Sequence, residues 1–178
     1  MLTSPLTANP LLRPLDPDRD GPALHAVFGD EESCRYLARP AFASVAETVA
    51  QLKQWGGPED DTSWAVVDRP AGPALGRVSL FTQGRDVWEA ACMIVPSARG
   101  RNLAARGLAE AIDFVFAEKG ARRIFADCDP DNIPSIRTFE KLGFRREGLL
   151  RGNWETHIGV RDSVILGLLR DDPRPWRN

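Results

Sequence analysis

The sequence has 178 residues, of which 43% are hydrophobic and 27% charged, a balance typical of one globular domain with a real core. Its net charge of -2 offers no overall attraction to nucleic acid, and no apolar run approaches the roughly 20 residues that span a membrane, so we expect neither partner. Three cysteines and two histidines lack paired spacing, which argues against a disulfide scaffold or a metal site. We therefore expect one cytoplasmic domain over residues 1–178, with no secretion signal and with loose ends at 1–9 and 172–178.

Hydrophobic periodicity and turn residues predict an alternation of strands and helices. In chain order, we expect a strand at 11–15, helices ending near 28 and 55, strands at 64–67, 75–81 and 87–95, a helix at 103–119, a strand at 124–128, a helix ending near 142, and strands at 144–150 and 163–169. This order indicates an α+β fold in which a mixed, mostly antiparallel sheet carries helices on both faces.

Capping residues indicate where three of the helices begin. Asp18 or Asp20 can cap the first helix, and Ser44 and Glu47 have the spacing of a capping box for the second. Asn132 can cap the last helix.

A basic turn joins the expected strand at 87–95 to the long helix. Residues 94–104 place a strand end, small residues and a helix start in succession. Free N–H groups at a helix N-terminus favour phosphate, Gly100 allows close backbone approach, and Arg99 and Arg101 add positive charge. The segment therefore predicts an anion site, and a solvated basic turn is the alternative interpretation.

A second motif follows this basic turn in the sequence and supports its interpretation as a binding site. Arg-Gly-Arg-Asn-Leu-Ala, residues 99–104, is followed after the next strand by Asn-x-x-Ser-x-x-x-x-Glu-Lys-Leu-Gly-Phe, residues 132–144. The pair resembles the GNAT superfamily of acyl-CoA-dependent N-acetyltransferases, and most closely its RimJ/RimL type, which includes ribosomal-protein N-terminal acetyltransferases. The resemblance covers most of residues 10–170.

The resemblance implies a GNAT fold that binds acetyl-CoA and needs no metal. The strands at 87–95 and 124–128 would splay apart to admit the pantetheine arm, with the pyrophosphate on the turn before the long helix. The residues implied in cofactor binding are Ile94, Val95, Arg99, Gly100, Arg101, Asn102, Leu103, Ala104, Asn132, Ser135 and Phe139. Asn102 stands where the family pattern has glycine, and asparagine is the non-glycine residue that best tolerates a left-handed backbone.

Ser135 is our candidate for protonating the departing thiolate. Many relatives use a tyrosine at the position of Phe139, which cannot donate a proton. Ser135 lies one helical turn earlier on the same face, and the matching serine of the RimJ/RimL type is thought to contact the cofactor sulfur. A role in capping the helix is the alternative.

Glu89 is our candidate for the base that deprotonates the amine, through water. It lies on the strand that enters the cofactor turn, where relatives often carry a glutamate; a structural ion pair is the alternative. Asp127 is a weaker substitute, and the backbone N–H of Val95 is the expected donor to the oxyanion. The aromatic residues Tyr36, Trp55, Trp88 and Trp154 are expected in the core rather than in the acceptor pocket.

These features predict transfer of an acetyl group from acetyl-CoA to a primary amine by direct attack in a ternary complex. The acceptor stays open between a protein N-terminus, a polyamine and an amino-bearing small molecule. A CoA-binding sensor without turnover is one alternative, and a nucleic-acid module using Arg145, Arg146 and Arg151 is another. Similar proteins commonly form homodimers, for which the apolar C-terminal strand offers an edge.

Overall fold

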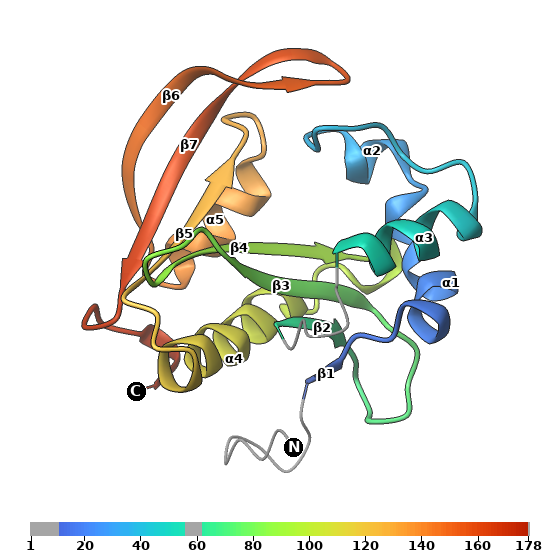
Figure 1. Ribbon diagram of the computed structural model, residues 1–178, viewed down its shortest axis with the longest axis horizontal. Coiled ribbons are helices and arrows are strands. Elements are labelled where there is room, and N and C mark those ends of the chain that lie inside the picture. Colours follow the sequence, from blue (N-terminus) through green and yellow to red (C-terminus); the bar gives the residue numbers. More distant parts are fainter. Residues whose placement is uncertain (1–10, 56–61, 178) are drawn as a thin grey trace.

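The computed structural model describes residues 11–55 and 62–177 (Figure 1). Its centre is a 7-stranded sheet with the strand order β1-β2-β3-β4-β5-β7-β6. The strands are β1 (Leu12–Pro14), β2 (Ser63–Val66), β3 (Gly76–Thr82), β4 (Val87–Ile94), β5 (Arg123–Cys128), β6 (Arg145–Thr156) and β7 (Gly159–Leu169). Neighbouring strands are antiparallel except for β4 and β5, which are parallel. This α+β architecture confirms the predicted fold class.

Helices cover both faces of the sheet. They are α1 (Pro17–Phe28), α2 (Glu31–Cys34), α3 (Val45–Trp55), α4 (Leu103–Glu118) and α5 (Ile133–Lys141), with short 3-10 turns η1 (Pro96–Ala98) and η2 (Pro175–Arg177). Figure 1 shows α4 running beneath β3 and β4, with α1 and α3 together at the other end of the molecule. The long helix α4 approaches the sheet closely at Gly107, where an added Cβ would lie 3.3 Å from side-chain atoms of Leu12 and Val78. The sheet therefore fixes the position of the helix that follows the basic turn.

The parallel pair β4 and β5 stays together over only a short distance. The ladder joins Val87–Glu89 to Arg123–Phe125 and ends there. Beyond it, β4 continues its pairing with β3 as far as Ile94, and β5 continues its pairing with β7 as far as Cys128. The two strands thus open toward their C-terminal ends, as the family resemblance implied.

The start of α1 differs from the prediction. Asp16, not Asp18 or Asp20, is the N-cap, and its Oδ1 accepts hydrogen bonds from the backbone N–H groups of residues 18 and 19 at 3.1 and 3.2 Å. Asp20 is instead buried and paired with Arg13, whose Nη1 lies 2.7 Å from its Oδ2. A buried carboxylate requires such a partner, so Asp20 serves the core rather than the cap.

The last two strands are longer than predicted and form a protruding hairpin. β6 extends to Thr156 and β7 starts at Gly159, although 144–150 and 163–169 were the expected ranges. Nearly every residue of β6 is exposed, so its sequence lacks the alternation that marks a half-buried strand. β7 lies between β5 and β6 and is not an edge; among the described strands the edges are β1 and β6.

Residues 172–177 are anchored, which corrects the expectation of a loose C-terminal end. Arg174 Nη1 lies 2.8 Å from the buried Asp113 Oδ1, Arg177 Nε lies 2.9 Å from the same atom, and Trp176 Nε1 donates to Oδ2 at 3.0 Å. The expected loose N-terminal residues 1–9 lie outside the described residues. No helix in the described ranges is long and apolar enough to cross a membrane.

Candidate active site

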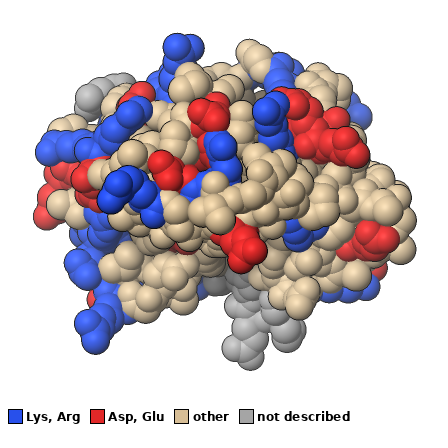
Figure 2. All heavy atoms as spheres, turned by 90° about the horizontal axis from the view of Figure 1, so that it is seen from above, with Lys and Arg blue, Asp and Glu red and all other residues tan. Residues whose placement is uncertain are grey.

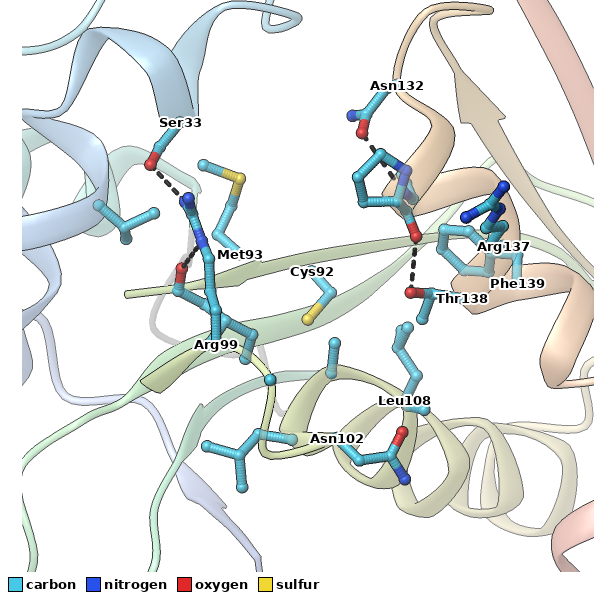
Figure 3. Close-up of a pocket in the computed structure, with 18 of the residues that line it drawn as sticks. Ser33, Cys92, Met93, Arg99, Asn102, Leu108, Asn132, Arg137, Thr138 and Phe139 are labelled. Atoms are coloured by element: carbon cyan, nitrogen blue, oxygen red, sulfur yellow. Dashed lines mark hydrogen bonds between the residues drawn. The ribbon is translucent and has the colours of Figure 1, made fainter. Parts of the chain in front are cut away.

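A cavity of about 790 Å³ opens between the C-terminal half of β4, the start of α4, and the helices α2 and α5. In Figure 3, Arg99 and Ser33 lie on one side of it, Asn132, Thr138 and Phe139 on the other, and Cys92 of β4 between them. Its size is within the range of cofactor-binding pockets. The helix α2, which the sequence did not predict, supplies Ser33 to this wall.

The turn before α4 presents backbone N–H groups to this cavity. Gly100 has a φ of +78° and nothing within 4 Å of the position of a Cβ, so a ligand can approach its backbone. Asn102 has φ 58° and ψ 22°, which confirms the predicted left-handed conformation, and as the N-cap of α4 it makes no side-chain capping bond. The first-turn N–H groups of α4 therefore have no acceptor within the helix, which suits an anionic ligand.

The basic residues of the turn take different directions. Arg99 lines the cavity and donates to Ser33 Oγ and, at 3.4 Å, to the carbonyl of Ile94. Arg101 does not line it, because its Nη2 pairs with Asp68 Oδ2 at 3.2 Å. Sequence reasoning expected both arginines at the cofactor.

Two basic residues of α5 were missed. Arg137 and Lys141 line the same cavity, and Lys141 Nζ donates to Asn102 Oδ1 at 3.0 Å. Their spacing of four residues on one helix face was the signal that could have found them. Together with Arg99 they give the cavity a local positive charge.

A second cavity of about 250 Å³ adjoins the first and is lined in part by residues of β4, β5, β6 and β7. Residues that line both cavities are Ser33, Tyr36, Cys92, Met93, Asn132, Ser135 and Phe139. Glu89, Asp127 and Trp154 line the second cavity alone. Tyr36 and Trp154, expected in the core, thus contribute to a cavity wall, and the Trp154 side chain is 45% exposed.

Ser135 lies where the two cavities meet. Its backbone N–H is capped by Asn132 Oδ1 at 3.3 Å, so Asn132 is the N-cap of α5, as predicted. The Ser135 hydroxyl is not used in capping and lies 3.3 Å from Cys128 Sγ. Phe139 is buried and packs edge-on against Phe144 at 5.1 Å between ring centroids. The other α5 hydroxyl that lines a cavity, that of Thr138, already donates to the Pro134 carbonyl at 2.8 Å, so Ser135 is our candidate donor.

Glu89 has the protonation behaviour of a base near neutral pH. Burial, and then the neighbouring Asp127, raise the pKa of its carboxyl from 4.5 to about 7, against a lowering by the hydrogen bond from Gln83 Nε2 at 3.0 Å. Within the described ranges no lysine or arginine forms an ion pair with it, so the structure offers no support for the alternative of a structural ion pair.

The thiols at this site are unreactive. Burial raises the pKa of Cys92 to about 12 and that of Cys128 to about 11, so both stay protonated at neutral pH. A protonated thiol is a poor nucleophile, which disfavours an acyl-cysteine intermediate. Among the described residues, no group of three or more His, Cys, Asp and Glu side chains is placed to hold a metal ion.

The expected oxyanion donor is wrong. The N–H of Val95 donates to the carbonyl of Leu75 at 2.9 Å and so faces β3. Backbone groups of successive strand residues point to opposite edges, which directs the N–H groups of Ile94 and Cys92 toward the opening. The Ile94 carbonyl, which accepts from Arg99, faces the same way.

Comparisons with known proteins agree with this geometry. The family model described as an acetyltransferase (GNAT) domain matches residues 10–145. The chain is 24% identical over 134 residues to the uncharacterized N-acetyltransferase YnaD of Bacillus subtilis (strain 168), covering 75% of this chain and 78% of that protein.

Solved structures share the fold. A GNAT-family acetyltransferase from Bacillus anthracis superposes with a TM-score of 0.81 at 20% identity, covering 90% of this chain and 95% of that one. Spermidine N-acetyltransferase from Vibrio cholerae, in complex with CoA and spermine, superposes with a TM-score of 0.76 at 19% identity, covering 90% and 95%. With the domain family matched over most of its length, this chain belongs to the GNAT family of acetyltransferases.

Proposed function

We propose that this protein transfers an acetyl group from acetyl-CoA to a primary amine, with both substrates bound at once. The observation that carries the proposal is the meeting of two cavities at Ser135, with the basic turn on one side and Glu89 on the other. The larger cavity suits the nucleotide and pantetheine of acetyl-CoA, and the smaller one suits the amine.

The cofactor cavity fits an anionic ligand. The backbone at Gly100 is open, the first turn of α4 offers free N–H groups, and Arg99, Arg137 and Lys141 supply positive charge. Leu103 and Ala104 complete the wall near the turn, and Asn132 lines the opposite side of the cavity. Arg101, held by Asp68, has a minor part in binding.

The chemistry follows from the groups at the junction. Glu89 takes a proton from the ammonium, and the nitrogen lone pair then attacks the thioester carbon. The N–H groups of Cys92 and Ile94 face the oxygen on which negative charge develops. As the carbon–sulfur bond breaks, Ser135 Oγ protonates the leaving sulfur, and the second proton lost by nitrogen restores the serine through water. The proton on Glu89 passes to solvent, so the products are an amide, a free thiol and one proton.

We assign the protein to the RimJ/RimL type on the strength of Ser135, which replaces the missing tyrosine hydroxyl at the position of Phe139. Protein N-termini, polyamines and amino-bearing small molecules all belong to the acceptor class.

The test combines binding and turnover. Calorimetry with acetyl-CoA, CoA and dephosphorylated CoA measures the cofactor cavity, and thiol release is then followed with an N-terminal peptide, spermidine and an amino sugar. We expect saturable binding and amine-dependent thiol release, with Ser135→Ala slowing release about 100-fold while leaving CoA affinity unchanged. Binding without release for every amine would favour a CoA sensor, and absence of binding would refute the proposal.

A further inference from the structure

The smaller cavity contains two carboxylates that share one face of the sheet. Glu89 pairs with Phe125 across the short parallel ladder, and Asp127 lies two residues beyond Phe125. Since side chains alternate along a strand, Glu89 and Asp127 point to the same side, at the place where β4 and β5 separate. Both line this cavity.

The arginines near this pair form ion pairs with other carboxylates. Arg161 of β7 lines the cavity, but its Nε lies 2.7 Å from Asp129 Oδ2 and its Nη2 contacts Asp131. Arg123, on the same face of β5, pairs with Glu147. Asp129 itself lines the cavity, and the other titratable groups that line it are Tyr36, Cys92, Cys128 and Asp162. Over residues 11–55 and 62–177, neither Glu89 nor Asp127 is in an ion pair. Acidic side chains outnumber Arg161 along the wall, so the cavity carries negative charge.

Neutral donors from β6 hold the Asp127 carboxylate in place. Its Oδ2 accepts a hydrogen bond from Trp154 Nε1 at 2.8 Å and from Asn153 Nδ2 at 3.3 Å. Asn153 is itself fixed by donating to Ser163 Oγ at 3.0 Å. Such donors orient the carboxylate without cancelling its charge.

We propose that Asp127 is a positioning residue that holds the acceptor's ammonium group beside Glu89 and thereby selects amines with no negative charge near the nitrogen. This inference rests on the proposed acetyl transfer. Two neighbouring carboxylates attract an ammonium and repel an anionic substituent, so an amine with an attached carboxylate is a poor acceptor. Burial raises the pKa of Glu89 to about 7 and the negative charge of Asp127 adds to this rise, which suits proton transfer.

The test uses three acceptors of one chain length: butylamine, 1,4-diaminobutane and 4-aminobutyrate. In the wild-type protein we expect kcat/KM to be lowest for 4-aminobutyrate. Asp127→Asn keeps the hydrogen bonds but removes the charge, so the KM of the two cationic amines should rise about tenfold with little change in kcat, and discrimination against 4-aminobutyrate should shrink. Asp18→Asn, which removes a charge on α1 that pairs with Lys53 at the surface, is the matched control.

A second variant separates charge from anchoring. Trp154→Phe removes the donor to Asp127 and keeps its charge; the side chain is exposed, so the fold should survive. We expect lower kcat/KM for all three amines with discrimination retained. A purely structural role for Asp127 predicts that both variants lower stability and leave the ratio between amines unchanged, and that result overturns the inference.

A readout without turnover distinguishes this inference from the proposed function. Carbon NMR of the Glu89 carboxyl should show its pKa falling toward the usual value in Asp127→Asn. If the wild type releases no thiol with any amine, the proposed function fails. Calorimetric titration of the CoA-loaded protein then decides the inference: equal binding of butylamine and 4-aminobutyrate, or an unchanged Glu89 pKa in the variant, refutes it.

Discussion

Replacement of Glu89 by glutamine should lower activity and raise stability at the same time. The amide cannot accept the ammonium proton, so we expect thiol release to fall 100-fold to 10,000-fold, the usual contribution of a general base. In the wild type, a pKa of about 7 means that about one-tenth of Glu89 is ionised at pH 6 and about nine-tenths at pH 8. The rate should therefore rise through pH 7, and this rise should be missing from the residual activity of the variant.

The gain in stability follows from the same carboxyl. Its pKa is raised from 4.5 to about 7 in the folded protein, so between these values the unfolded chain ionises first and the wild type loses stability as pH rises. The full difference corresponds to an upper limit of about 3.4 kcal/mol. Since the side chain keeps some contact with solvent, we expect Glu89→Gln to be more stable by about 1–2 kcal/mol at pH 8 and by nearly nothing below pH 4.5.

Urea denaturation at several pH values checks the predicted gain in stability, and thiol release checks the predicted loss of activity. Glu110→Gln is the control, because burial also raises the pKa of Glu110 but its place on α4 is outside both cavities. It should leave the pH profile of activity unchanged. A stability difference for Glu89→Gln that does not grow with pH would show that Glu89 is not a destabilised base, and the reasoning above would fail.

Three further outcomes are expected. Arg99→Ala should weaken acetyl-CoA binding about tenfold in calorimetry, whereas Arg101→Ala, which removes only a surface pair with Asp68, should change it less than twofold; equal losses would contradict this division. Asn102→Gly should keep CoA affinity, but Asn102→Val should reduce it and cost about 1–2 kcal/mol in thermal unfolding, since a branched residue resists the left-handed backbone. Asp113→Ala should cost about 3–5 kcal/mol and expose residues 174–177 to limited proteolysis, because it leaves two arginines without their buried partner; a protease-resistant tail would argue against the anchor.

Local sequence and the family resemblance together predicted the elements that build the cofactor side. The left-handed Asn102, the Asn132 cap and the splayed strands at 87–95 and 124–128 all depend on residues close together in the chain or on the family motif. Ser135 and Glu89 were chosen through the same resemblance, and their catalytic roles stay predictions; Ser135 lines both cavities and Glu89 lines the second.

Features that depend on distant parts of the chain could not be predicted. Asp18 or Asp20 was the predicted cap of α1, and the contact between Asp20 and Arg13 of the preceding strand removes Asp20 from that role. The direction of Arg101 is set by Asp68, 33 residues earlier.

The wall of the second cavity also depends on contacts between distant parts of the chain. Tyr36 and Trp154 meet there because the segment after α2 and the hairpin of β6 and β7 come together at the opening, and His157 Nδ1 lies 3.2 Å from the Leu37 carbonyl across 120 residues. Helical or strand periodicity contains no information on such an approach, so large aromatics in these segments look like core residues.

Because only three residue pairs join β4 to β5, the sheet consists of two halves that are connected over a short distance. The helix α4 packs against the half formed by β1 to β4, and α5 packs against the half formed by β5, β7 and β6. A ligand in the opening between β4 and β5 would contact both halves and restrict their motion relative to each other. CoA binding should therefore slow hydrogen exchange at this part of the sheet. The amide protons of Cys92 and Ile94, which face the opening, should exchange more slowly once CoA is bound. The N–H of Val95 already donates to the Leu75 carbonyl, so its exchange rate should change little.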